Sequence, residues 1–401
     1  MSEWVNMKYL PLSKCAKFRN DRISSEKVTI NNYISTENML PDRGGVEDAA
    51  SIPVAKTLSK YIAGDILLSN IRPYFKKIWI ADKTGGCSND VLVIKSNETN
   101  AKFLYYVLSD NNFFNYSTVT SKGTKMPRGS KSAIMKYLVP DIKKQDQTSI
   151  AEILSAYDDA IENNNRRIAL LEKAAQELYR EWFVRFRFPG YKKAKFVNGL
   201  PEGWEVVKLG DVVKIKGGKR LPLGHNLVSF STKHPYIRIR DIFESKFISL
   251  NNTFEYIEDK TFNIIKRFIV NTGDILISIV GTIGSIACVG KSLDNANLTE
   301  NCVKLVNYEK ISKNYIYHFL VSEIGKGLIK AGIVGATQPK LPLYNIARIK
   351  LLKPCKLLLE HYDIKMDNLN SEIMNLQDQS QNLARQRDLL LPRLMSGKLE
   401  V

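Results

Sequence analysis

One long segment of the chain has the spacing of a coiled-coil helix. Apolar or helix-interface residues recur at alternating spacings of four and three at Ile150, Leu154, Tyr157, Ile161, Asn164, Ile168, Leu171, Ala175, Leu178 and Trp182. No Pro or Gly interrupts this a/d stripe, and at ~1.5 Å per residue it predicts a rod of roughly 50 Å. Because so narrow an apolar stripe must be buried against another helix, the chain needs a partner helix.

A matching stripe lies at the other end of the chain, at Tyr362, Met366, Leu369, Ile373, Leu376, Ser380, Leu383, Arg387, Leu390 and Leu394. Polar residues interrupt both stripes, and polar residues at such positions usually fix register and pairing. We predict that the two helices pair within one chain. The predicted interface comprises Leu154, Tyr157, Ile161, Ile168, Leu171, Leu178, Leu369, Ile373, Leu376, Leu383 and Leu390. Two helices that pack separately on their own domains, or a homodimeric coil, are the alternatives.

Length and charge set the class of protein. A chain of 401 residues is too long for one ordinary domain and predicts two or three. Its 59 Lys and Arg residues exceed its 41 Asp and Glu residues, which gives a formal net charge of +18. This excess favours a polyanionic partner, and nucleic acid is the first candidate. Many basic proteins, however, bind nothing specific.

The sequence predicts neither a membrane segment nor a metal site. No apolar run reaches the ~20 residues of a membrane span, and the start of the chain lacks the pattern of a signal peptide. The five cysteines are scattered without a C-x-x-C pair, and the four histidines lie near none of them in the sequence. We therefore expect free thiols in a reducing cytoplasm and no metal.

The chain also repeats itself. The opening matches the segment at Trp204, with Trp4 and Trp204, like Lys8 and Lys208, 200 residues apart. Other segments match at an offset of 209, for Gly64-Asp65-Ile66-Leu67 and Gly273-Asp274-Ile275-Leu276, and at an offset of 213, for Thr124-Lys125-Met126-Pro127 and Thr337-Gln338-Pro339-Lys340. A period of this length indicates a domain duplication. The predicted order is a first globule over 1–145, a central helix over 146–186, a linker over 187–203, a second globule over 204–355 and a C-terminal helix over 356–401.

Candidate catalytic motifs do not hold. The stretch from Gly284 to Ser292 imitates a Walker A loop, but five residues separate its glycines where the motif needs four. The acid-x-Lys triplets at Asp141 and Asp363 resemble an element of metal-dependent nucleases, although an acid at the entrance to a long helix is better explained by the helix dipole. The chain also lacks an Asn-Pro-Pro-Tyr-type motif, a Gly-x-Gly cofactor loop and a catalytic triad. We expect no catalysis by this chain alone.

Binding remains, and basic residues on predicted loops are its candidates. Arg and Lys side chains contact phosphates and read guanine, whereas Asn and Gln read adenine. The candidate DNA-binding residues are Lys14, Arg19, Arg72, Lys76, Lys122, Lys125, Arg128, Lys216, Lys219, Arg220, Arg238, Arg240, Gln338 and Lys340. For any one of them a solvated surface position is the alternative.

Several segments together resemble the specificity subunit of type I restriction–modification systems. They are Leu200-Pro201-Glu202-Gly203-Trp204, the paired Gly-Asp-Ile-Leu turns, Gly281-Thr282-Ile283-Gly284, Thr337-Gln338-Pro339-Lys340-Leu341 and Leu389 to Lys398. The order globule, helix, globule, helix resembles it too. The first copy departs from the pattern, with Arg72-Pro73-Tyr74 in place of the glycine turn and Lys125-Met126-Pro127 in place of Thr-Gln-Pro.

The resemblance implies an α/β (α+β) fold with two target-recognition domains and two long antiparallel coiled-coil helices related by a pseudo-two-fold axis. Each domain would read one half of a split, asymmetric site on double-stranded DNA. The helices would set the gap and dock two modification subunits that carry S-adenosylmethionine. Restriction subunits, which use ATP and Mg²⁺, are possible further partners. The alternatives are a stand-alone DNA-binding or coiled-coil scaffold protein and, less favoured, a DNA methyltransferase or nuclease in its own right.

Overall fold

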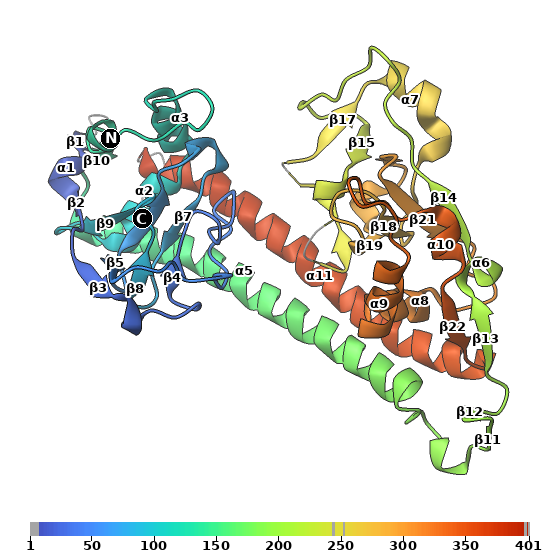
Figure 1. The fold of residues 1–401 in the computed structure, drawn as a ribbon. Coiled ribbons are helices and arrows are strands. Elements are labelled where there is room, and N and C mark those ends of the chain that lie inside the picture. Colours follow the sequence, from blue (N-terminus) through green and yellow to red (C-terminus); the bar gives the residue numbers. More distant parts are fainter. Residues whose placement is uncertain (1–7, 243–244, 252, 397–398, 400–401) are drawn as a thin grey trace. The chain divides into compact units, whose positions relative to one another are not determined.

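The chain divides into two compact units within a computed structural model, which describes residues 8–242, 245–251, 253–396 and 399. Unit 1 contains Met1–Asn163 and Gln379–Val401, and unit 2 contains Asn164–Asp378. The two long helices, α5 (Lys144–Tyr179) and α11 (Lys356–Met395), each contribute one segment to either unit. Figure 1 shows both units in the colours of the sequence.

Unit 1 is a mixed α/β lobe built on an antiparallel four-stranded sheet. Its order is β2-β9-β6-β7, formed by Ala16–Phe18, Val91–Ser96, Ile66–Ser69 and Ile78–Ile80. A second sheet has the order β3-β5-β8-β4, formed by Arg22–Ser24, Thr57–Tyr61, Gly85–Cys87 and Tyr33–Ile34, and β1 (Tyr9–Pro11) pairs with β10 (Leu138–Pro140). The helical elements are α1 (Leu12–Cys15), η2 (Ser25–Lys27), η3 (Pro73–Phe75), α2 (Ala101–Ser109), α3 (Asn111–Val119) and α4 (Lys131–Ile134).

Unit 2 has a related but larger set of strands. Its main sheet has the order β14-β21-β18-β19-β16, formed by Lys214–Gly217, Cys302–Val306, Ile275–Ser278, Ile286–Val289 and Phe247–Ile248. Three small sheets are β17-β15-β20 (Glu255–Ile257, His234–Ile237 and Asn297–Leu298), β13-β22 (Glu205–Lys208 and Lys350–Lys353) and β11-β12 (Phe196–Val197 and Leu200–Pro201). The helical elements are α6 (Leu209–Val212), η6 (Ile239–Asp241), α7 (Asp259–Ile265), η7 (Lys266–Phe268), η8 (Lys291–Leu293), α8 (Lys313–Val321), α9 (Glu323–Ala331) and α10 (Leu343–Ala347).

The Gly-Asp turn predicted from sequence has the same structure in both units. Gly64 and Gly273 have φ angles of +87° and +83°, which glycine adopts without steric cost. The carboxylate of Asp65 accepts the backbone N–H of Ile62 at 2.9 Å, as the carboxylate of Asp274 accepts that of Asn271 at 3.0 Å. Each turn leads into a fully buried strand, β6 or β18. The duplication predicted at an offset of 209 is therefore confirmed.

The offset of 200 predicted between Lys8 and Lys208 is wrong. The N–H of Leu12 donates to Tyr137 O, and the N–H of Leu209 donates to Ile349 O, both at 2.8 Å. Leu12 therefore corresponds to Leu209, an offset of 197 where the letters at Lys8 predicted 200. Backbone hydrogen bonding between strands fixes their register, whereas matching residue types in the sequence do not. Trp4 lies outside the described residues.

The long helices pair within the chain, as the stripes predicted. In unit 2, side chains of α5 share one core with side chains of α11: Ile168, Leu171 and Leu178 with Leu369, Ile373 and Leu376. In unit 1, Leu154 of α5 and Leu390 of α11 belong to another core. The remaining predicted interface residues, Tyr157, Ile161 and Leu383, are half-buried. Because the early part of α5 packs with the late part of α11, and the late part with the early part, the pair is antiparallel.

Polar groups join the two helices in each unit. In unit 1, Arg387 of the second stripe forms an ion pair with Asp158 of α5. In unit 2, Arg167 Nη2 lies 2.6 Å from Glu372 Oε1. The Arg387 pair is mostly shielded from solvent, with side-chain exposures of 19% and 30%. The partly buried Arg387–Asp158 pair suits the role of fixing register that the sequence assigned to polar stripe positions, whereas the side chains of Arg167 and Glu372 are 50% and 44% exposed.

The segment predicted as a linker is more ordered than its composition suggested. After α5, a π-helical turn, η4 (Arg180–Val184), leads into a short 3₁₀ turn, η5 (Tyr191–Lys193), and then the β11-β12 hairpin. The ring centroids of Phe188 and Trp204 lie 5.6 Å apart, and both residues are buried. Aromatic burial therefore attaches this segment to the core of unit 2.

Candidate nucleic-acid interface

Two loops lie together in each unit, and their backbones make the same hydrogen bonds. We call residues 70–75 with 122–128, and residues 279–284 with 334–340, the loop pairs of unit 1 and unit 2. In unit 1, the N–H groups of Lys122 and Arg128 each donate to the other residue's carbonyl at 2.9 Å. Gly129 N–H donates to Asn70 O at 2.9 Å, and Asn70 N–H donates to Asp90 O at 2.8 Å. These bonds tie both loops to the beginning of β9.

The loop pair of unit 2 repeats this pattern bond for bond. Val334 and Lys340 exchange two backbone hydrogen bonds, both 2.9 Å long. Leu341 N–H donates to Ile279 O at 2.9 Å, and Ile279 N–H donates to Asn301 O at 2.8 Å. The first loop follows β6 in unit 1 and β18 in unit 2. The duplication thus extends from the buried strands to these surface loops.

This pattern corrects the predicted alignment of the loops. Gly123 and Gly335, with φ angles of +93° and +92°, stand in the same place 212 residues apart. The predicted offset of 213 paired Pro127 with Lys340 and is wrong. The corrected register matches proline with proline, at Pro127 and Pro339. It also places Met126 opposite Gln338, and Arg128 opposite Lys340.

Most of the predicted DNA-binding residues are accessible. The exposed ones are Lys14, Lys122, Lys125, Arg128, Lys216, Lys219, Arg220, Arg240, Gln338 and Lys340. Of these, the loop pairs bring together Lys122, Lys125 and Arg128 in unit 1, and Gln338 and Lys340 in unit 2. Arg72 and Lys76, at either end of η3, are half-buried. Their backbones adopt the left-handed conformation, with φ angles of +50° and +52°.

Two predicted DNA-binding residues instead stabilise their own lobe. Arg19 is only 7% exposed in its side chain, and its Nε lies 2.6 Å from Asp65 Oδ2. Arg238, 13% exposed, donates from Nε to Asp241 Oδ2 at 2.9 Å and also pairs with Glu255. The hydrogen bond from Arg19 to Asp65, the larger of the causes that favour its charge, raises the pKa of the Arg19 guanidinium. The sequence could not separate these arginines from surface ones, because their carboxylate partners are set by the fold.

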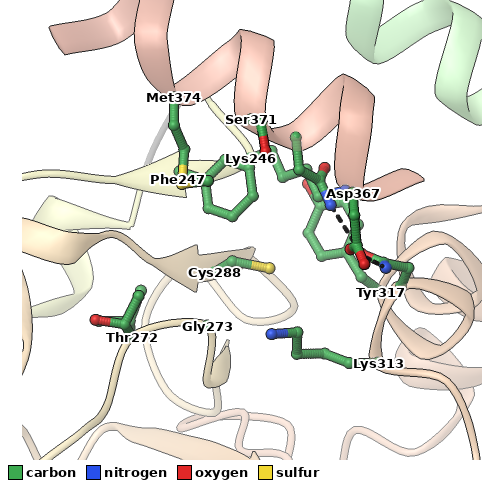
Figure 2. A pocket seen from close by; sticks show the side chains of 13 residues that line it. Lys246, Phe247, Thr272, Gly273, Cys288, Lys313, Tyr317, Asp367, Ser371 and Met374 are labelled. Carbon is green, nitrogen blue, oxygen red and sulfur yellow. Dashed lines mark hydrogen bonds between the residues drawn. The ribbon is translucent and has the colours of Figure 1, made fainter. Parts of the chain in front are cut away.

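A pocket of about 200 Å³ in unit 2, lined by both apolar and polar side chains, was not anticipated from the sequence (Figure 2). Buried Lys246 lies in its wall, with its Nζ 4.6 Å from the ring centroid of Tyr317 and 3.5 Å from His318 Nε2. Burial lowers the pKa of Lys246 to about 8. His318 Nδ1 in turn lies 2.7 Å from the hydroxyl of Tyr362 on α11.

The pocket and the loop pair lie at opposite ends of one strand. Thr272 and Gly273 of the pocket wall come directly before β18, whereas residues 279–284 come directly after it. Glu172 of α5 accepts the backbone N–H of Lys246 at 2.9 Å. The polar groups around Lys246 therefore attach the lobe to both long helices within unit 2, away from the loops.

The motifs that imitate catalytic sites are structural. The segment resembling a Walker A loop forms β19 and η8. Asp363 was predicted to stand at the entrance of a long helix, and this is wrong, because α11 already begins at Lys356. Its carboxylate instead accepts hydrogen bonds from Ser312 Oγ at 2.5 Å and Asn314 Nδ2 at 2.8 Å. Among the described residues, no group of three His, Cys, Asp or Glu side chains could hold a metal ion. No helix in the described ranges is long and apolar enough to cross a membrane.

Fold and site together define a class of protein: a tandem pair of mixed α/β lobes, each with a cationic loop pair, joined by two long helices. The model of the type I restriction modification DNA specificity domain matches residues 10–173 and again residues 201–356. The chain belongs to this family.

Curated relatives agree with this assignment, and a solved structure shares the fold. The chain is 26% identical over 316 residues to the type I restriction enzyme MjaIX specificity subunit of Methanocaldococcus jannaschii, covering 75% of this chain and 69% of that protein. It is 22% identical to the HindI specificity subunit of Haemophilus influenzae, over 84% and 86% of the two chains. The crystal structure of the type I restriction–modification S subunit from M. genitalium has the same fold, with a TM-score of 0.55, 17% identity and coverage of 98% and 97%.

Proposed function

We propose that this chain is the DNA sequence-specificity subunit of a type I restriction–modification complex. The observation that carries the proposal is the duplicated match to the DNA specificity domain. Its first copy covers the lobe of unit 1 and most of α5, and its second covers the lobe of unit 2 as far as the start of α11. Each lobe would read one half of a bipartite, asymmetric site. The matched loop pairs support this division of labour, because they give both lobes the same means of approaching DNA.

We further propose that catalysis belongs to partner subunits in the cytoplasm. Two modification subunits would bind the long helices and bring S-adenosylmethionine, and restriction subunits that use ATP and Mg²⁺ would join the complex where the system contains them. Exposed apolar side chains on the helices, such as Leu170 of α5 and Ile364 of α11, offer contact area for such partners. The net charge of +18 supports binding to double-stranded DNA.

Methylation mapping tests the proposal. Cells that express the modification subunit with this chain should methylate adenines in one split motif, and cells that lack the chain should not. Replacing residues 1–145 with the corresponding lobe of another specificity subunit should change one half of the motif only. A methylation pattern that is the same with and without the chain would exclude the proposal.

The main rival is a scaffold that assembles partners without touching DNA. The two functions differ in their response to salt, because phosphate contacts release counterions and make affinity fall steeply with ionic strength. The complex of this chain with its modification subunits should bind duplex DNA with such a slope, whereas a scaffold would add nothing to the DNA affinity of the modification subunits alone.

A further inference from the structure

The loop pairs present a contrast between shared backbone hydrogen bonds and different side chains. Four backbone hydrogen bonds fix each pair, and their lengths agree to 0.1 Å between the two units. The exposed tips of the second loops differ, since Met126 in unit 1 occupies the position that Gln338 has in unit 2. The first loop differs as well, with Arg72-Pro73-Tyr74 in unit 1 and a glycine turn in unit 2.

One property of the side chains is common to both pairs. The residue that closes the second loop is a cation in each unit, Arg128 or Lys340. Both are exposed, and their backbones are fixed by two hydrogen bonds to Lys122 or Val334. A cation on a fixed backbone loses less conformational freedom when it binds than one on a mobile loop.

The lobes also differ away from the loop pairs. Unit 1 carries a four-stranded second sheet, β3-β5-β8-β4, where unit 2 has the three-stranded sheet β17-β15-β20 and the helix α7. On the proposed function, on which this inference rests, the two lobes read different sequences. An element that both lobes share is suited to a task that both perform, and contact with phosphates is that task, because phosphates carry no sequence information.

We propose that the loop pairs are sequence-independent clamps on the DNA backbone, with Arg128 and Lys340 as equivalent phosphate-contacting residues. In unit 1 the exposed Lys122 and Lys125 strengthen the positive field around Arg128. In unit 2 the amide of Gln338 provides a neutral donor beside Lys340, and such groups also bind phosphate oxygens. Base reading then belongs to parts of each lobe outside the loop pairs, such as the second sheets, which differ between the units.

The salt dependence of DNA binding tests this inference. The variants are Arg128→Ala, Lys340→Ala and the double variant, each assembled with the modification subunits. Binding is measured from low to moderate salt on two duplexes, one with the methylated motif and one without. Each single variant should reduce the slope of log K against log salt by about one, and the double variant by about two. Affinity for both duplexes should fall by the same factor.

Matched controls separate the clamp from a general loss of charge. Lys27→Ala in unit 1 and Lys326→Ala in unit 2 each remove an exposed cation outside the loop pairs, and their slopes should match the wild type. Arg128→Lys keeps the charge and should keep the slope. All substituted side chains are exposed, and circular dichroism with thermal unfolding verifies that each variant is folded.

The outcomes distinguish this inference from the proposed function. An unchanged slope, or a loss of affinity for the motif duplex alone, overturns the clamp, and so does a changed methylation motif in either variant. The proposed function fails separately, if the wild-type complex shows no preference for any sequence.

Discussion

Asp90 and Asn301 occupy the same place in the two lobes but differ by one charge. The carbonyl of each accepts a hydrogen bond of 2.8 Å from the first residue of its loop pair. In unit 1, the Asp90 carboxylate also lies 3.2 Å from Arg128 Nη2, in a pair whose side chains are 33% and 58% exposed. An exposed pair of this kind contributes little to stability, about 0–1 kcal/mol, but it competes with phosphate for the same guanidinium.

Asp90→Asn should therefore tighten DNA binding. The substitution copies the residue of unit 2, removes a charge that repels phosphate and frees Arg128. We expect an increase in affinity of about threefold, which corresponds to roughly 0.7 kcal/mol, on duplexes with and without the motif. Titration at fixed salt measures this effect, and the same substitution in an Arg128→Ala background should give less. Weaker binding by Asp90→Asn would contradict the assigned competition.

The burial of Lys246 should make the folding stability of the chain depend on pH. Burial lowers its pKa from 10.5 to about 8 in the folded chain, so between these values the unfolded chain holds more protons. Stability from this group therefore rises with pH across that window. Its neighbours His318, Glu172, Cys288 and Lys313 remain in a Lys246→Met variant.

Urea unfolding from pH 8 to pH 10.5 tests the effect of Lys246. The difference between wild type and Lys246→Met isolates it, because other thiols and phenols titrate in both proteins. As pH rises, the free energy of unfolding of the wild type should increase relative to that of the variant by up to about 3 kcal/mol, because each unit of pKa shift corresponds to about 1.36 kcal/mol. A difference that is flat over this window would show that the ammonium is not desolvated.

At the scale of elements, the second loops of the two loop pairs can be exchanged between the units as a test. Residues 122–128 and 334–340 have equal length and the same closing hydrogen bonds, so each should fit the other unit without strain. If both loops contact only phosphates, the exchange should leave the methylated motif unchanged. Sequencing of methylated adenines in cells with the exchanged chain measures this. A change in the half-site read by either unit would place base contacts in these loops.

The elements also show how far sequence reasoning reached. Buried strands such as β6 and β18 were predictable, because a turn glycine with positive φ precedes a short apolar run in both copies. The register of the repeats was not, since hydrogen-bond partners such as Tyr137 and Ile349 are distant in sequence. The same limit applies to Arg19, whose partner Asp65 reaches it only through the fold.

At the scale of the whole molecule, we predict that the long helices set the length of the unread gap between the two DNA half-sites. Seven residues inserted after Asn163 in α5 and after Asp378 in α11 preserve the a/d stripe and lengthen each helix by about 10 Å. With one base pair per ~3.4 Å, the unread gap in the methylated motif should grow by about three base pairs. Insertion in α5 alone should instead disrupt the pairing. A gap that is unchanged by the double insertion would refute the idea that the helices measure it.

Sequence alone determined the two helices, the duplication and the basic character of the chain. These features follow from spacing, repetition and composition, which are local or additive and need no knowledge of which distant residues meet. The tertiary structure decided which cations are free and which are paired, how the copies align, and that Lys246 is buried against α8. Each of these depends on contacts between residues far apart in the chain, because the burial and partners of a charged side chain are set by its neighbours in space and not by its neighbours in sequence.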